Sequence, residues 1–187
     1  MKRIEKLRLF ESKEITNDDI SDFLTNISES DLRLIKNQIN SNSKNINEAV
    51  GSLILGFILS SPKLIELLGK LVKTIYNLFS KKKMESNSII EFGISLEHKY
   101  IGILKKLIKL VGVDKKAGLK TEEDLEQAAK TLFYVILGAA AIDGGITTVA
   151  NIKALFTQEI LTKAGLTTLK TSEITSAIKN LVKTPTE

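Results

Sequence analysis

The chain has 187 residues, of which 50 are Leu or Ile, so it can build an aliphatic core and is not expected to be disordered. It has no cysteine and one histidine, His98, which excludes a disulfide scaffold, a thiol nucleophile and a multi-histidine metal site. The net charge of +5 conceals a basic segment, residues 63–120, with 13 basic and 5 acidic side chains. Such a segment can attract nucleic acid or anionic lipid, although 24 of the 27 basic residues are Lys, as solvated helix faces would also give.

The first part of the chain is expected to form a helical hairpin. A first helix begins near Asn17, with aspartates close to its positive end, and Ser28 or Ser30 caps a second helix. A polar stretch without helical period follows and reads as a linker. We therefore predict two regions, an N-terminal helical hairpin over 1–45 and a main helical domain over 46–187.

Residues 49–79 are the first of two unusually hydrophobic helical segments. Pro62 has no amide hydrogen and disfavours helical geometry at the residue before it, so we expect a break or kink there. Beyond Pro62, apolar residues alternate at spacings of four and three, which predicts a seam that packs against other helices. The seam comprises Leu64, Leu68, Leu71 and Ile75.

A basic polar connection over 80–88 precedes the next apolar segment, which starts at Ile89 and is expected to stop at Gly112. The apolar residues of this segment recur at helical spacing, although a strand over residues 89–96 is an alternative. Lysines in the connection and along the polar face of the helix are the candidates for contact with an anionic surface. These candidates are Lys81, Lys82, Lys83, Lys99, Lys105, Lys106 and Lys109.

The second hydrophobic segment is residues 131–156. Thr121, followed by acidic residues, predicts a helix start, and the helix is expected to run to about Ile142. Small residues spaced four apart near its end let helix backbones approach closely, while a plain helix terminus is the alternative reading. These candidate packing residues are Ala140, Ala141, Gly144 and Gly145.

Two further helices complete the predicted architecture. One runs from about Thr147 to near Gly165, and a last helix is capped by Thr171 or Ser172. A loop is expected over 114–120. We therefore predict an all-α fold, a helical bundle of six to eight helices, two of them unusually hydrophobic.

No group of residues in the sequence has the pattern of a catalytic site. The acidic clusters near Asp18 and Glu122 suit helix N-termini and have no histidine partner, and the chain lacks both common glycine-rich phosphate-binding motifs. We therefore expect a protein that is not an enzyme, with no catalytic residue, no cofactor, no metal and no small-molecule substrate.

The first twelve residues, Met1 to Ser12, combine Met-Lys, a short mixed apolar and basic stretch, and then Phe10-Glu11. This opening resembles the beginnings of many tailed-phage virion proteins. The resemblance implies a structural or packaged component of a phage particle, such as an internal head protein. It carries over no functional residue.

Two hypotheses for function follow. In the first, the chain is a non-enzymatic phage virion or assembly component in the virion or host cytoplasm, acting through helix–helix contacts with protein partners or with itself, its lysines touching the nucleic acid backbone. In the second, it is a membrane-active helical protein that inserts residues 49–79 and 131–156, with Lys81–Lys83 kept on the cytoplasmic side. A soluble interaction domain encoded by the host is a third interpretation.

Overall fold

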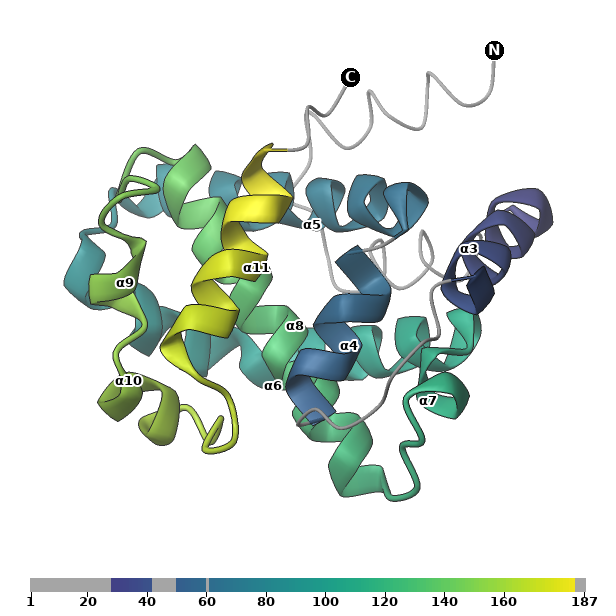
Figure 1. Cartoon of the computed structure of the whole chain (residues 1–187). Helices are drawn as coiled ribbons and strands as arrows, with labels where there is room; N and C mark the ends of the chain where they lie inside the picture. Colours follow the sequence, from purple (N-terminus) through teal and green to yellow (C-terminus); the bar gives the residue numbers. More distant parts are fainter. Residues whose placement is uncertain (1–27, 42–49, 60, 184–187) are drawn as a thin grey trace, which may run out of the picture.

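The computed structural model describes residues 28–41, 50–59 and 61–183, and these residues form helices and connections without a strand. The predicted all-α bundle is confirmed (Figure 1). The elements in chain order are α3 (Glu29–Ser41), α4 (Val50–Leu59), α5 (Pro62–Lys82), the 3-10 helix η1 (Ser86–Ser88), α6 (Ile89–Val111), α7 (Val113–Lys116), α8 (Glu122–Asp143), α9 (Ile152–Leu155), α10 (Gln158–Lys163) and α11 (Thr171–Lys183).

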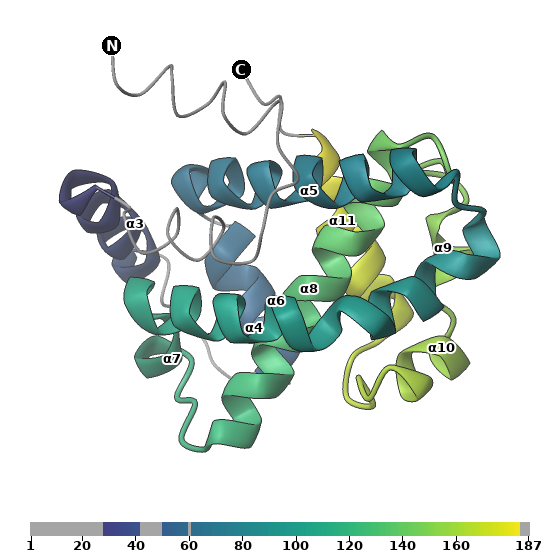
Figure 2. The same cartoon turned by 180° about the vertical axis from the view of Figure 1, so that it is seen from behind.

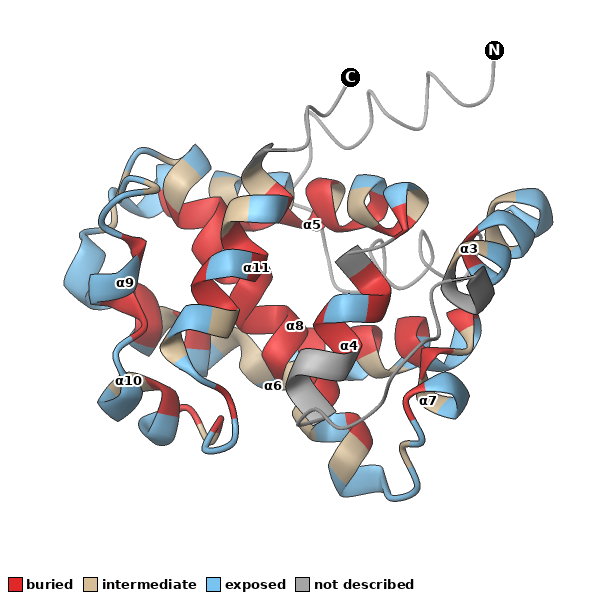
Figure 3. Cartoon of the chain, in the orientation of Figure 1, coloured by how far each residue is buried: buried red, intermediate tan, exposed pale blue. Residues whose placement is uncertain are grey.

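Helix α8 runs through the middle of the bundle and contacts α4, α5, α6 and α11. Seen from the back, α5 and α6 lie on two sides of α8 (Figure 2). The stretch 131–141 of α8 is buried without interruption (Figure 3). Because its four neighbours each turn an apolar face toward it, α8 organises one continuous core.

Local signals explain where the long helices begin and end. Ser61 caps α5 by accepting a hydrogen bond from the backbone N–H of Leu64, and Pro62 occupies the first helical position, where its missing N–H costs nothing. Gly112 ends α6 in the left-handed conformation, at φ +79°. Thr121 starts α8 through a capping box with Asp124, as the sequence predicted.

Two glycines allow the helices around α8 to pack closely. A Cβ atom added at Gly93 of α6 would lie 2.5 Å from a methyl group of Leu137. One added at Gly138 would lie 2.4 Å from Ile178 of α11 and 3.0 Å from Phe156. The absence of a side chain at these two positions therefore sets the distances from α8 to α6 and to α11.

Helix α3 packs onto the body of the bundle. Ile35 is fully buried, and the buried Ser61 hydroxyl donates a hydrogen bond of 2.9 Å to Oε1 of Gln38. Ser28 caps α3, as expected, by accepting from the N–H of Asp31. The first twelve residues, the first helix of the predicted N-terminal hairpin and residues 42–45 of the linker expected over 40–45 lie outside the described residues, so the division at residue 45 stays a prediction. Residues 40 and 41 belong to α3 rather than to a linker.

The hydrophobic segment 131–156 comprises the second half of α8, the turn after it and α9, and the predicted helix end near Ile142 is confirmed to within one residue. Helix α8 ends at Asp143, as the glycines suggested, and the N–H groups of Ile146 and Thr147 both donate to the carbonyl of Ala141, which folds the chain back. Gly145 has φ +67°, a left-handed conformation that glycine adopts without strain.

The single helix predicted from about Thr147 to near Gly165 is wrong, because the structure has two short helices in this stretch. It is replaced by α9 and α10, because Thr157 adopts an extended conformation and caps a new helix by accepting from the N–H of Ile160. Gly165, at φ +77°, follows the end of α10, where the sequence predicted a helix to stop. The last helix begins at Thr171 itself, one residue earlier than a cap at Thr171 requires, and Glu173 accepts a hydrogen bond from the N–H of Lys170.

Three smaller expectations also changed. The stretch 89–96 is helical rather than a strand, because Ile89, Ile90 and Gly93 share a buried face at helical spacing. The loop expected over 114–120 contains the end of α7, whose hydrogen bonds start from the carbonyl of Gly112. Short helices such as α7 raise the total over the described ranges to nine α-helices, above the six to eight predicted. The break at Pro62 is confirmed.

Candidate functional site

The lysine candidates lie at the C-terminal end of α5 and along the outer side of α6. Lys81, Lys82 and Lys83 are exposed, and they complement the negative end of the α5 helix dipole. The ammonium group of Lys82 lies 4.7 Å from the ring centre of Phe92, a cation–π distance. This contact joins the end of α5 to the start of α6.

Two lysines of α6 share one acidic residue of α8, which offsets one of their two charges. Glu122 forms ion pairs with Lys105 and, at 3.6 Å, with Lys109. The hydrogen bond from Lys105 is the main reason that the pKa of Glu122 lies below its ordinary value. The side chain of Lys105 is also only 21% exposed, so Lys105 is a poor contact for an external anion, whereas the Lys109 side chain is 56% exposed and is held back only by its ion pair.

Lys99 and Lys106 differ from this pair. Both are exposed, and neither forms an ion pair with any residue in the described part of the chain. They are seven residues apart, which places them on one side of α6 about 10 Å apart along its axis. Phe92 lies a further seven residues before Lys99, so Lys82 stands at the start of the same line. We call this group, Lys81, Lys82, Lys83, Lys99 and Lys106, the basic edge.

The chemistry of the basic edge is that of a row of point charges. Lysine ammonium groups attract phosphate without reading a sequence. Arg33 is the one arginine in the described ranges; it belongs to α3 and pairs there with Glu29 at 2.6 Å. The edge therefore has no planar guanidinium for base recognition, and its one neighbouring aromatic ring, that of Phe92, is already in contact with Lys82 and Phe79.

The predicted packing seam of α5 lies inside the molecule. Leu64, Leu68 and Ile75 are fully buried and Leu71 is 4% exposed. The seam faces the core of this chain, beside α8. It is therefore already covered and offers no surface to a second copy in this conformation.

The four small residues at the end of α8 divide into two kinds. Ala140 and Ala141 are fully buried, and a Cβ atom on Gly144 would lie 3.1 Å from the ring of Tyr76 in α5. Gly145 has open space around it and serves the turn. Three of the four thus lie at a close approach between α8 and its surroundings, and Gly145 does not.

One polar cluster near the core was missed by the sequence reasoning. Glu97 of α6 is bound on both carboxylate oxygens, by the ammonium group of Lys130 at 2.8 Å and by the hydroxyl of Tyr134, which donates at 2.9 Å. Burial, and then the charge of Glu97, raise the pKa of Tyr134 well above its ordinary value. The spacing of Lys130 and Tyr134, four residues apart on an apolar helix, was a signal that both face one partner.

Helix α8 is the one helix, in the part of the chain that the structure describes, with the length and apolar composition to cross a membrane. In this structure 78% of its most apolar stretch is buried by other helices. Asp143 sits at its end, where partial burial raises the pKa of the carboxyl group and Lys73 opposes that shift. The burial of its apolar stretch by neighbouring helices is typical of the core helix of a bundle.

His98 is exposed on α6, beside a shallow hollow that also borders Glu97, Lys105 and Glu126. No group of three histidine, aspartate or glutamate side chains in the described ranges is placed to hold a metal ion. Comparison with known proteins found no matching family model, no similar curated protein and no similar solved structure. The geometry and charge of the chain itself therefore carry the functional argument.

Proposed function

We propose that this chain is a non-enzymatic virion or assembly component of a tailed phage, whose helical body carries a basic edge that contacts the phosphate backbone of nucleic acid. One observation carries the proposal: the five lysines of the basic edge are exposed and form no ion pair in the described residues, while Lys105 and Lys109 are paired with Glu122. The opening Met1 to Ser12 supports the assignment to a phage particle.

The physical argument rests on charge without specificity. An ammonium group that approaches a phosphate releases a condensed counterion, so affinity falls as salt rises, whatever the sequence. If three to five lysines of the edge meet phosphates, the slope of log K against log salt is about −3 to −4.5 on duplex DNA. A packaged protein that binds at many places along a genome needs binding that does not depend on the nucleotide sequence.

Filter binding on a duplex of arbitrary sequence, repeated over a range of salt concentrations, tests the contact. The double substitution Lys99→Gln with Lys106→Gln is expected to make the salt slope shallower by about two. The matched control, Lys105→Gln with Lys109→Gln, removes the same charge from the same helix and is expected to change the slope less, because Glu122 already offsets one of the two charges and pairs with both ammonium groups. Binding without salt dependence, or equal effects of the two double variants, would contradict the proposal.

The place of the chain in a particle needs its own experiment. Mass spectrometry of phage particles purified from the host that carries the gene is expected to detect the protein, and cross-linking in those particles should identify its protein partners or further copies. Absence of the protein from purified particles would end the virion assignment while leaving the nucleic acid contact open to the salt titration.

A second candidate function is a membrane-active protein, favoured by the length and apolar composition of α8. Release of α8 into lipid would require the surrounding helices to separate from it, and the Glu97–Lys130 pair to break. Flotation with anionic vesicles tests this candidate. Recovery of the whole protein in the vesicle-free fraction, at low and high salt, would count against it.

A further inference from the structure

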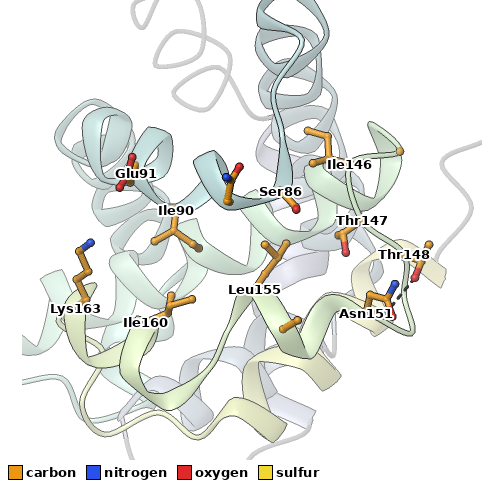
Figure 4. A pocket seen from close by; sticks show the side chains of 13 residues that line it. Ser86, Ile90, Glu91, Ile146, Thr147, Thr148, Asn151, Leu155, Ile160 and Lys163 are labelled. Atoms are coloured by element: carbon orange, nitrogen blue, oxygen red, sulfur yellow. Dashed lines mark hydrogen bonds between the residues drawn. The ribbon is translucent and has the colours of Figure 1, made fainter.

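The chain has a surface pocket of about 710 Å³ at the end of the molecule away from α3. Its walls come from η1 and the start of α6, from the loop between α8 and α9, and from α9 and α10 (Figure 4). Its volume lies in the range of small-molecule sites, about 300–1,000 Å³. Three separate parts of the chain thus converge on one concave surface, which the function proposed above does not use.

The floor of this pocket is aliphatic. Ile90, Ile146, Leu155 and Ile160 line it, and they come from α6, the α8–α9 loop, α9 and α10. Ile90 and Leu155 each expose 7% of their surface. A ligand that covered these four side chains would remove apolar surface from water, which favours binding by roughly 25 cal/mol per Å².

The charged groups of the pocket stand at one side of it. Glu91 follows Ile90 on α6 and Lys163 lies one turn after Ile160 on α10, so each charge flanks a floor residue (Figure 4). Both side chains belong to exposed residues, and they form no ion pair with each other or with another residue of the described ranges. Glu91 can therefore bind a cationic group and Lys163 an anionic group, both beside the aliphatic floor.

From this arrangement we propose that the pocket binds a small zwitterion with an aliphatic body. The ligand's ammonium group meets Glu91, its carboxylate meets Lys163, and its body lies on Ile90 and Ile160. Hydroxyl and amide side chains of the α8–α9 loop border the other side and suit a neutral polar group or water. A ligand with one charge alone would leave one of the two rim charges without a partner.

The test titrates the full chain, labelled with ¹⁵N, with three probes that share one branched aliphatic body. L-leucine carries both charges, 4-methylpentanoate only the carboxylate and isoamylamine only the ammonium. Leucine is expected to shift the amide signals of residues 145–151 and to bind about threefold or more tighter than either analogue. No shift in that loop with leucine, or equal binding of all three probes, would overturn the proposal.

Two charge-removing variants assign the groups. Glu91→Gln is expected to weaken leucine and isoamylamine but leave 4-methylpentanoate unchanged, and Lys163→Gln is expected to weaken leucine and 4-methylpentanoate but leave isoamylamine unchanged. Lys153→Gln, an exposed lysine on α9 outside the pocket lining, is the matched control. Loss of all three probes equally in either rim variant would contradict the assignment of the charges.

Discussion

Helices α6 and α8 are nearly equal in length, 23 and 22 residues, yet they occupy opposite kinds of environment. Helix α6 contains ten Leu and Ile residues and α8 contains five, but α8 has the longer buried stretch, 131–141. The difference lies in where the charges stand. In α8 the charged residues before Asp143 all fall in its first nine positions, whereas α6 carries lysines on one side to its last turn.

This comparison shows that the placement of charge, more than total apolar content, decides which helix becomes central. Twelve successive uncharged residues, 131–142, let α8 accept neighbours on every side. The lysines of α6 keep one side in water, because a lysine ammonium group is rarely buried without a partner. Helix α6 is therefore the one of the two that can meet an external anion.

The largest expected effect comes from truncating the centre of α8. Phe133 is fully buried against Tyr100 and Tyr134, with ring centres 5.7 and 5.3 Å away. Phe133→Ala should lower the free energy of unfolding by about 3–5 kcal/mol in a urea titration. The corresponding change on the outside of α6, Leu110→Ala, should cost less than about 0.5 kcal/mol. Similar losses for the two variants would break the comparison.

A somewhat smaller loss is expected where α6 and α8 share a buried charge. Lys130→Met leaves Glu97, a side chain that is 17% exposed, with the Tyr134 hydroxyl as its remaining donor. We expect this change to cost about 2–3 kcal/mol in chemical unfolding. Adding Glu97→Gln to the same protein should recover part of the loss, and Lys153→Met should have little effect. If the double variant were no more stable than the single one, the pair would not be the cause.

The same substitution should have opposite signs in the two helices. Gly138→Ala in α8 pushes a methyl group into Ile178, which should cost about 1–2 kcal/mol despite the better helix propensity of Ala. Gly102→Ala in α6 meets open space and should stabilise the protein by about 0.5–1 kcal/mol. Thermal unfolding of both variants measures whether each substitution raises or lowers the stability. A change in the same direction at both positions would contradict the difference between the two environments.

The start of α8 should contribute about as much as a typical helix cap. Thr121 accepts a hydrogen bond of 3.0 Å from the N–H of Asp124, so Thr121→Ala is expected to cost about 1 kcal/mol. Thr121→Ser keeps the hydroxyl and should behave like the natural protein in the same urea titration. A Ser variant as unstable as the Ala variant would locate the effect elsewhere.

The smallest effect is a dependence on pH at the same cap. The pKa of Asp124 is lowered because its carboxylate accepts from the backbone N–H groups of Thr121 and Lys120. A lowered folded-state pKa adds stability above the unfolded value, near pH 4, and that stability is lost as the pH falls through the folded value. The stability difference between the natural protein and Asp124→Asn should therefore shrink below about pH 4. A difference that grew with acidity would contradict this sign.

Much of the fold was accessible from the sequence because its signals act within one helical turn. Pro62 acts on the residue before it, and Gly112 and the Thr121 cap act on residues three or four positions away; each of the three marks a helix boundary in the structure. The errors fell where a short-range competitor was overlooked. Thr157 is one example, since its hydroxyl caps α10 inside a stretch whose apolar period ran on without interruption.

The candidate site was less accessible for the same reason. The four candidate lysines of α6 looked equivalent in the sequence, because periodicity shows which side of a helix is polar but not which helix lies across from it. Glu122 belongs to α8, yet it pairs with Lys105 and Lys109 of α6. The pocket beside Ile90 was likewise invisible, since its walls come from segments more than fifty residues apart along the chain.

By itself the sequence determined an all-α chain, its main helix boundaries, and a basic middle next to apolar helices, because helix caps and periodicity are written in neighbouring residues. Only the tertiary structure decided that α8 is central, that Glu97 holds Lys130 and Tyr134 together, and that a subset of the lysines faces solvent without an acidic partner in the described residues. These are relations between helices, and their energies arise from burial and ion pairing between side chains that are remote along the chain.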